Sequence, residues 1–484
     1  MKSFLSRRLV LILIVAVVVF GSLSCSDGDG ESTMGSIVGF ALRWNQSDHS
    51  GITVTLYDVV AADPAVTSVL NQYNVIGFAL NQSCLFDHRY YTEVRTTTTD
   101  GSGRFSFGDL GDGEYNVVAE DTTYGFRYIL EVSVSGSEAR TDTVTLYLIE
   151  EPPTQILQTT TWESGHHYRI TQDVRVAEGA QLNIERGTFI RFGSDLIGYT
   201  KLEVRGTLNA VGEPNDFIHW IRNDISEPWN QVKLESSGSE QNNIEWNVFD
   251  GGTISLMCEG SNLSLQRCLF RNSSSSGASI NNVGNIQVEN CLFLDNSNGS
   301  GLSCTYANAG QIMYNLFHNN NTGFDCRWSS YPTFRSNWIG NCSDGIFTQY
   351  IFVGQSGDTL VIANNEIESC YDGIRASGST FGTFKHNEIS QCSHRAINIT
   401  PLYGGYSQPV INYNNLTRED SGVILALALE VNDRDVDARN NWWGTTQNIP
   451  DLIYDGNDPG NTATGIVDYT PFLTVPYPGA GIAW

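Results

Sequence analysis

Between residues 240 and 445 the chain repeats one short pattern, an Asn or Cys followed two places later by a mostly apolar residue. The first position is held by Asn247, Cys268, Cys291, Asn315, Asn337, Asn365, Asn387, Asn414 and Asn441. Successive members lie 21 to 28 residues apart. This spacing is too uneven for a helical array, whereas a winding β-structure expels extra residues as loops at its corners. The pattern therefore predicts the coils of a β-solenoid.

Other positions repeat in step with this pattern. Five residues after it stand Cys342, Cys370 and Cys392, and eight after it stand Gly323, Gly345 and Gly373. Each coil is expected to hold two short apolar strands, with a turn and a Gly of positive φ between them. With these repeats, residues 155–475 resemble the right-handed parallel β-helix family, which includes pectate lyases, polygalacturonases and many bacterial surface proteins. The resemblance implies a fold and leaves function open.

The ends of the predicted solenoid differ from its middle. Exposed terminal coils would present free strand edges, so they need atypical caps. Residues 440–473 resemble a closing segment found on bacterial β-helices. Within it, we expect Trp442 and Trp443 to pack over the open end of the core, with a sugar platform as the alternative. Residues 476–484 are assigned as a tail.

Residues 37–149 alternate between apolar and polar positions with period two and are expected to form a small antiparallel sandwich. Five segments carry this pattern: 37–40, 51–57, 103–107, 113–118 and 142–146. Residues 96–118 resemble the carboxypeptidase-regulatory-like domain, which implies a transthyretin-type accessory module without catalytic residues. An irregular stretch at 61–95 is interpreted as an insertion without a role, with a binding loop as the alternative. Residues 150–154, with two prolines, are a short stiff linker.

The first 24 residues predict export. Basic residues Lys2, Arg7 and Arg8 precede the apolar run 9–20, which is too short to prefer spanning a bilayer. Residues 21–25 resemble a bacterial lipobox, which implies that Cys25 is lipidated and becomes the mature N-terminus. Residues 25–36 then form a flexible tether. We therefore expect an envelope protein anchored by lipid to the outer membrane or cell surface, with plain secretion as the alternative.

Composition narrows the choice of partners. The 484 residues include 27 basic and 53 acidic side chains, which gives a net charge of −26. Such a balance argues against nucleic acid, because binding phosphate backbones depends on a basic surface. No calcium-binding loop or metal-ligand spacing stands out, so we predict no metal and no cofactor. We expect a monomer.

The ten cysteines would ordinarily suggest disulfides in an exported chain. Several share columns, however, as Cys268 and Cys291 do, and Cys304 and Cys326 are close to a shared column. Stacked strands lie about 4.8 Å apart, whereas the Cβ atoms of a disulfide lie about 3.8 Å apart. We therefore favour free thiols stacked inside the solenoid, with strained bridges as the alternative.

One column of residues could support catalysis. Asp344, Asp372 and His394 each stand seven residues after the repeated position, so adjacent coils would bring them together. Both aspartates precede a Gly and are interpreted as turn residues, with an acid/base group as the alternative. Glu366 and Glu388 are likewise expected to be solvated. The Asp motifs of polygalacturonases are missing, so enzyme activity is uncertain and we lean against it.

Aromatic residues near the predicted corners are the candidate carbohydrate-binding groups. They are Trp328, Tyr331, Tyr350, Tyr371, Tyr403 and Tyr406. The sequence as a whole predicts an all-β, exported, lipid-anchored scaffold, with polysaccharide as its candidate ligand. Two alternatives stay open: a polysaccharide lyase or glycoside hydrolase, and a structural spacer or adhesin.

Overall fold

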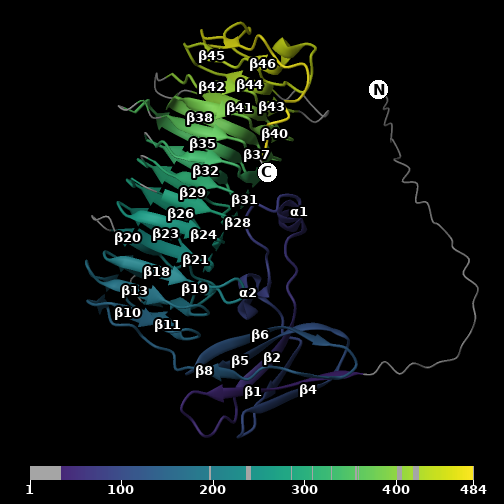
Figure 1. The fold of residues 1–484 in the computed structure, drawn as a ribbon, viewed down its shortest axis with the longest axis vertical. Helices are drawn as coiled ribbons and strands as arrows, with labels where there is room; N and C mark the ends of the chain where they lie inside the picture. The colour runs from purple at the N-terminus through teal and green to yellow at the C-terminus, as the bar shows by residue number, and fades with distance from the viewer. Residues whose placement is uncertain are drawn as a thin grey trace, which may run out of the picture.

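The computed structural model describes residues 34–195, 198–235, 241–284, 286–307, 309–328, 330–354, 357, 359–400, 406–417 and 425–482. The predicted all-β fold class is confirmed: a small sandwich precedes a long stack of β-coils (Figure 1). The predicted signal peptide, Cys25 and most of the tether lie outside the described residues.

Two four-stranded sheets form the sandwich. One contains β1 (Gly35–Arg43), β4 (Arg104–Leu110), β7 (Glu138–Arg140) and β8 (Val144–Leu146). The other contains β2 (Thr53–Asp58), β3 (Arg95–Thr98), β5 (Gly113–Asp121) and β6 (Gly125–Val134). Side chains such as Ile37, Leu56 and Val117 are fully buried between the sheets, as the period of two requires. Three strands were not predicted: the short β3 and β7, and β6, whose central residues are half-buried and do not alternate.

Three parallel sheets run the length of the coil stack, which we call sheets 1, 2 and 3. Sheet 1 has thirteen strands: β9 (Gln155–Ile156), β12 (Val174–Val176), β17 (Lys201–Val204), β20 (Gln231–Glu235), β23 (Ile254–Glu259), β26 (Ser276–Asn281), β29 (Ser300–Thr305), β32 (Thr322–Arg327), β35 (Asp344–Ile351), β38 (Asp372–Thr380), β41 (Arg395–Thr400), β44 (Leu425–Leu429) and β46 (Ile453–Tyr454).

Sheets 2 and 3 have eleven strands each. Sheet 2 contains β11 (His167–Ile170), β14 (Phe189–Phe192), β19 (Ile218–Arg222), β22 (Asn247–Asp250), β25 (Leu269–Arg271), β28 (Leu292–Leu294), β31 (Leu316–His318), β34 (Trp338–Gly340), β37 (Glu366–Glu368), β40 (Glu388–Ser390) and β43 (Asn415–Leu416). Sheet 3 contains β10 (Thr160–Trp162), β13 (Gln181–Ile184), β18 (Thr207–Val211), β21 (Gln241–Glu245), β24 (Asn262–Gln266), β27 (Ile286–Glu289), β30 (Gln311–Met313), β33 (Thr333–Arg335), β36 (Leu360–Ala363), β39 (Gly382–Lys385) and β42 (Val410–Asn412). Two small pairs remain, β15 (Ser194–Asp195) with β16 (Gly198–Tyr199) and β45 (Val436–Asp437) with β47 (Val467–Asp468).

The repeated Asn is a buried ladder inside the coils. Each of Asn315, Asn337, Asn365, Asn387 and Asn414 donates a side-chain hydrogen bond from Nδ2 to the Oδ1 of the next member, at 2.9 to 3.1 Å. The last acceptor is Asn441, and all six side chains are fully buried. A buried amide must find partners, and its counterpart one coil away supplies them. This explains why the sequence repeats Asn at coil spacing.

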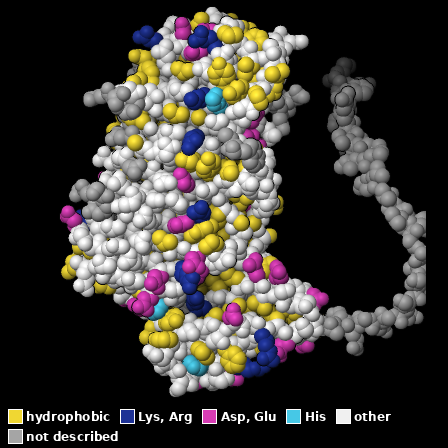
Figure 2. All heavy atoms as spheres, viewed as in Figure 1, with side chains coloured by type: hydrophobic (Ala, Val, Ile, Leu, Met, Phe, Trp, Pro, Cys, Tyr) yellow, Lys and Arg dark blue, Asp and Glu magenta, His cyan; other side chains and the backbone are white. Residues whose placement is uncertain are grey.

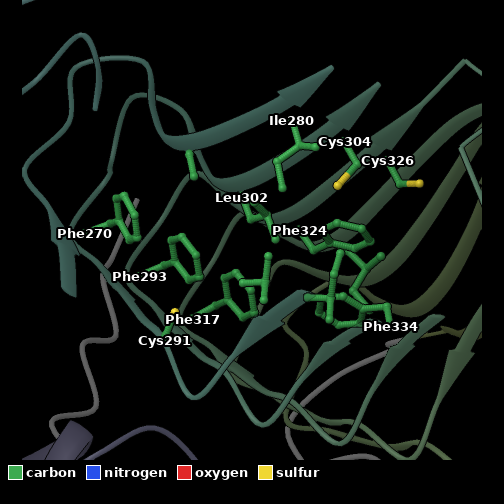
Figure 3. Packing of buried hydrophobic residues seen from close by; sticks show 14 of the residues in the cluster. Phe270, Ile280, Cys291, Phe293, Leu302, Cys304, Phe317, Phe324, Cys326 and Phe334 are labelled. Atoms are coloured by element: carbon green, nitrogen blue, oxygen red, sulfur yellow. The ribbon is translucent and has the colours of Figure 1, made fainter. Parts of the chain in front are cut away.

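Aromatic rings stack in the core in the same manner. Phe249, Phe270, Phe293 and Phe317 lie one above another with ring centroids 4.6 to 5.0 Å apart, and Figure 3 displays the last three in a row. This spacing matches the separation of neighbouring strands and suits stacked rings.

The nine described cysteines are buried and have free thiols. Cys304 and Cys326 are register partners on β29 and β32, and Figure 3 places both in the core. Burial raises the pKa of the Cys258 and Cys392 thiols to about 12. The prediction of inward-facing thiols is therefore confirmed.

The predicted role of the repeated glycines is wrong. Gly323, Gly345 and Gly373 lie inside strands and do not have positive φ. A Cβ atom on any of them would lie 2.5 to 2.6 Å from a carbonyl oxygen of the next coil. Glycine is required there because the backbones approach closely.

Both ends of the coil stack are capped by aromatic side chains. Trp162 and Tyr168 stack with centroids 4.6 Å apart and are buried at the first coil. At the other end Trp443 is buried in the core, and its ring centroid lies 6.4 Å from that of Tyr469. The 3₁₀ helix η2 (Ile449–Leu452) lies between these two residues in the sequence. The packing prediction holds for Trp443, while Trp442 is half-buried.

The irregular stretch at 61–95, which we call the insertion, packs against the outside of sheet 2. It contains α1 (Pro64–Gln72), α2 (Gln82–Leu85) and the 3₁₀ helix η1 (His88–Tyr90), and both labelled helices lie beside the coils in Figure 1. Its apolar side chains share one buried cluster with outward-facing residues of sheet 2. The sequence analysis expected no role, but the insertion joins the sandwich to the coils.

Hydrogen bonds reinforce this contact. Gly77 N donates to Tyr314 O at 2.8 Å, and Asn290 Nδ2 donates to Val75 O at 2.7 Å. Further along, Arg271 Nη1 donates to Leu85 O at 3.1 Å.

The predicted C-terminal tail also lies on sheet 2. Residues 476–482, which we call the C-terminal strap, are held by Asn415, whose Oδ1 accepts from Tyr477 N at 2.7 Å. Asn364 Nδ2 donates to Gly479 O at 3.0 Å, and Gly481 N donates to His386 O at 2.9 Å. Ile482 joins the apolar cluster of the insertion. Segments from both ends of the chain therefore cover this sheet.

Candidate functional site

Strands β32 to β41 of sheet 1 gather charged side chains on their outer surface, which we call the charged face. Register pairs Asp344 with Asp372 and Asp372 with Arg395. A second row joins Asp325, Phe347, Arg375 and Asn398. In the view of Figure 2, several basic and acidic side chains stand in a line along an otherwise mostly uncharged coil stack.

Asp372 is the buried centre of the charged face. It is the first residue of β38 rather than a turn residue, and only 2% of it is exposed. Its carboxylate lies 2.8 Å from His394 Nδ1 and accepts from Asn398 Nδ2 at 2.7 Å. His394 also stacks on Tyr371, with ring centroids 4.5 Å apart. The turn interpretation is therefore wrong for Asp372, because strand pairing and burial hold it.

Asp344 lies one coil earlier, at the first position of β35. Burial raises the pKa of its carboxyl to about 6, against the opposing effect of Arg375, whose Nη1 is 3.5 Å away. The turn interpretation fails here too. A carboxyl that titrates near pH 6, beside a His–Asp pair, is chemically suited to proton transfer. Of the pair, the His394 side chain is 34% exposed and is the part a solute can reach.

Arginine and an aromatic ring occupy the middle of the charged face. Arg327 Nε donates to Asp325 Oδ1 at 2.7 Å, and burial raises the pKa of Asp325. The guanidinium groups of Arg327 and Arg375 lie 4.8 and 5.7 Å from the Phe347 ring centroid. The buried Nε atom of Arg375 has no hydrogen-bond partner within the described part of the chain.

Three aromatic rings line a corner of sheet 1, and we call Tyr306, Trp328 and Tyr350 the aromatic corner. Tyr306 and Trp328 directly follow β29 and β32, and Tyr350 lies near the end of β35. Ring centroids of Tyr306 and Trp328 are 6.3 Å apart, and those of Trp328 and Tyr350 are 4.6 Å apart. Tyr306 is 49% exposed and Trp328 is 42% exposed, while Tyr350 is half-buried. The wider pair is offset sideways by about 4 Å if coils are spaced 4.8 Å apart, which leaves part of each face open.

The sequence analysis missed Tyr306, although a signal was present. Each ring stands five residues after a strand glycine: Tyr306 after Gly301, Trp328 after Gly323 and Tyr350 after Gly345. The relation is hidden when positions are counted from the repeated Asn or Cys. The segment from Cys291 to Gly301 is two residues longer than the corresponding segments of the next two coils.

The backbone at the aromatic corner is left-handed, with φ of 52°, 56° and 56° at the three residues. Neighbouring coils use Asn282 (φ 53°) and Gly378 (φ 64°) at the equivalent positions. Asn and Gly tolerate this conformation, whereas it costs other L-residues roughly 1–2 kcal/mol. Local backbone preference therefore does not explain the aromatic side chains.

The remaining predicted aromatic residues are not part of this corner. Tyr331 packs against the core, and Tyr371 stacks on His394 at the other side of the charged face. Tyr406 lies under Arg434, whose guanidinium is 4.8 Å from the ring centroid. Tyr403 lies outside the described residues.

Two further kinds of feature are absent from the described residues. No group of three or more His, Cys, Asp or Glu side chains is placed to hold a metal ion. No described helix is long and apolar enough to cross a membrane.

Comparison with known proteins identifies the coil stack. Residues 215–351 match a family model described as "Right handed beta helix region". The coil stack is thus a right-handed parallel β-helix, as predicted. No curated protein sequence matched the chain.

The solved structures that are similar to this chain include a tailspike protein and an exopolygalacturonase. One is the Dettilon tailspike protein (gp208), with a TM-score of 0.33 and 11% identity over 67% of this chain; the match spans 62% of the tailspike chain. The other is a family 28 exopolygalacturonase from Yersinia enterocolitica, with a TM-score of 0.32 and 9% identity over 89% of this chain and 94% of the enzyme.

Proposed function

We propose that this chain is an exported, lipid-anchored cell-surface scaffold whose β-helix binds polysaccharide at the aromatic corner and the adjoining charged face. The carrying observation is the aromatic corner itself. Three rings occupy left-handed positions that the adjoining coils give to Asn282 and Gly378, and two of the rings are more than 40% exposed. Unfavourable local conformations persist where function needs the side chain.

Polysaccharide suits the chemistry of this surface. Sugars present apolar C–H faces, which pack on aromatic rings, and hydroxyl groups, which need donors and acceptors close by. The charged face supplies both kinds of polar group within one strand length of the rings, from Asp325, Arg327 and Arg375. A polymer can meet equivalent groups on successive coils, because the coils repeat.

Glycan binding is tested with Trp328→Ala, and Trp44→Ala is the matched control. Trp44 is 54% exposed on the sandwich, far from the corner in sequence. On a glycan array followed by titration, Trp328→Ala should weaken binding of a retained polysaccharide about two- to tenfold, since one aromatic contact is worth about 0.5–1.5 kcal/mol. Trp44→Ala should bind normally. Equal binding by both variants, or no retained glycan, would favour the spacer or adhesin function.

Membrane attachment through Cys25 is the second part of the proposal. Its support is the order of basic, apolar and small residues before Cys25, and a sandwich that resembles an accessory module. Cys25→Ala should abolish palmitate labelling and release the protein from the membrane fraction. An unlabelled, soluble wild type would contradict the anchor.

Catalysis is a second candidate function, favoured by one observation: Asp344, whose pKa is raised to about 6 by burial, is the register partner of Asp372 in the Asp372–His394 pair. If this group transfers protons, His394→Gln should lower turnover roughly 100- to 10,000-fold. Reducing-sugar and unsaturated-uronate assays on neutral and uronate polysaccharides measure it. We expect no turnover by wild type, and cleavage that His394→Gln loses would establish an enzyme.

A further inference from the structure

Two glutamates lie beneath the C-terminal strap on the outer surface of sheet 2. Glu366 and Glu388 are register partners on β37 and β40, and Glu368 stands two residues along the first strand. Neighbouring strands place such carboxyl groups about 5 Å apart. The sequence analysis expected solvated side chains, but the strap and the insertion cover them.

Contacts from both covering segments meet the glutamates. A Cβ atom on Gly481 of the strap would lie 2.7 Å from Glu366 Oε2 and 3.4 Å from Glu388 Cβ. From the insertion, the Tyr73 hydroxyl hydrogen-bonds to Glu366. Glu388 accepts from Asn415 Nδ2 at 2.6 Å, and the same Asn415 holds Tyr477.

From these contacts we propose that Glu366 and Glu388 form a proton-operated latch: the strap lies closed over the neutral carboxyl groups and is released when they ionise. The other titratable or charged groups facing the latch are Glu368, Tyr73, Lys385, His386 and Tyr477. Two ionised carboxylates under a closed strap would repel each other. No described basic side chain forms a salt bridge with either of them. Opening the strap restores water to both.

The direction of the pH dependence follows from protonation. Burial, then the neighbouring Glu388, raises the pKa of Glu366 to about 8, and burial raises the pKa of Glu388. The closed form therefore binds more protons than the open form, in which a free Glu titrates at about 4.3. Closure is strongest at acid pH, weakens by up to about tenfold per pH unit for each carboxyl group that ionises, and for Glu366 levels off above about pH 8.

Hydrogen exchange of the intact protein between pH 5 and 9, corrected for intrinsic rates, measures the latch. Protection of the strap amides of Tyr477 and Gly481 should fall with pH in wild type, while amides of β35 stay protected. Glu366→Gln keeps the shape without the charge, so its strap should lose most of that slope. Glu289→Gln, on β27, is the control and should behave as wild type.

A second variant tests the latch independently, in case Glu366→Gln does not fold. Tyr73→Phe keeps the ring but removes the hydrogen bond that lowers the pKa of Glu366, so strap protection should keep falling to a higher pH before it levels off, and the strap should be more open than in wild type at pH 9. Strap protection that is constant from pH 5 to 9 in wild type, or an unchanged slope in Glu366→Gln, overturns the latch.

Discussion

The outer surfaces of sheets 1 and 2 differ in what packs against their corner aromatic residues. Aromatic residues stand at left-handed positions beside each sheet. They are Trp246 and His386 beside sheet 2, and Trp328 beside sheet 1. Trp246 packs against Phe78 of the insertion with centroids 5.4 Å apart, and His386 stacks on Tyr477 of the strap at 5.1 Å. Trp328 meets only Tyr306 and Tyr350 among the described rings.

The difference teaches what a corner aromatic does in this molecule. On sheet 2 the insertion and the C-terminal strap cover the corner. Apolar contact with these segments offsets the conformational cost of the left-handed residue. On sheet 1 the rings stay more than 40% exposed at Tyr306 and Trp328. This exposure is why we propose that a ligand covers the rings of this corner.

Carboxyl groups differ between the two surfaces in the same way. On sheet 2 burial under the cover raises the pKa of both stacked carboxyl groups, those of Glu366 and Glu388. On sheet 1 the stacked pair Asp344 and Asp372 is matched by Arg375 and His394. Charge on the covered surface is retained where a partner is present, as in the buried pair of Arg271 and Asp250 on sheet 2, whereas Glu366 and Glu388 have no basic partner among the described residues.

The largest expected effect is on the covered surface. Leu292 is fully buried beneath the insertion, where a Cβ on Gly77 would meet its side chain at 2.5 Å. Leu292→Ala should lower the free energy of unfolding by about 2–5 kcal/mol, since it opens a cavity. Denaturant unfolding measures it. Met257→Ala, at a half-buried outer position of sheet 1, should cost under about 1 kcal/mol, and equal losses would break the comparison.

A smaller loss is expected inside the charged face. Asp372→Asn replaces one carboxylate oxygen by an NH₂ group, which cannot accept a hydrogen bond. The single remaining oxygen then cannot serve both His394 and Asn398 as the two carboxylate oxygens do. We expect about 1–3 kcal/mol of lost stability, the cost of leaving a buried donor unsatisfied. The control Asp325→Asn keeps an acceptor for Arg327 and should cost less. A thermal melt at which Asp372→Asn matches wild type would show that the burial of Asp372 carries little energy.

The smallest effect on stability sharpens the comparison most. Tyr306→Asn installs the residue that Asn282 supplies one coil earlier, so stability should stay the same or rise by up to about 1 kcal/mol. Glycan binding should nevertheless weaken. A clear loss of stability with binding unchanged would mean that the corner rings serve packing, and the ligand assignment would fall.

Sequence alone determined the coils, because each repeated residue contacts its own counterpart one coil away. The spacing of 21 to 28 residues records the buried Asn ladder, the stacked thiols and the adjacency of Asp344, Asp372 and His394. Residue type was less informative than position: Gly323 and Asp372 were assigned to turns, but both lie in strands.

Only the tertiary structure decided which surface is covered. The contact of Arg271 with Leu85 spans 186 residues, and that of Asn415 with Tyr477 spans 62. Such contacts occur once and leave no periodic trace, so the insertion looked dispensable and Glu366 looked solvated. Periodicity encodes what neighbouring coils do to each other; burial of a coil's outer surface depends on where distant segments come to rest.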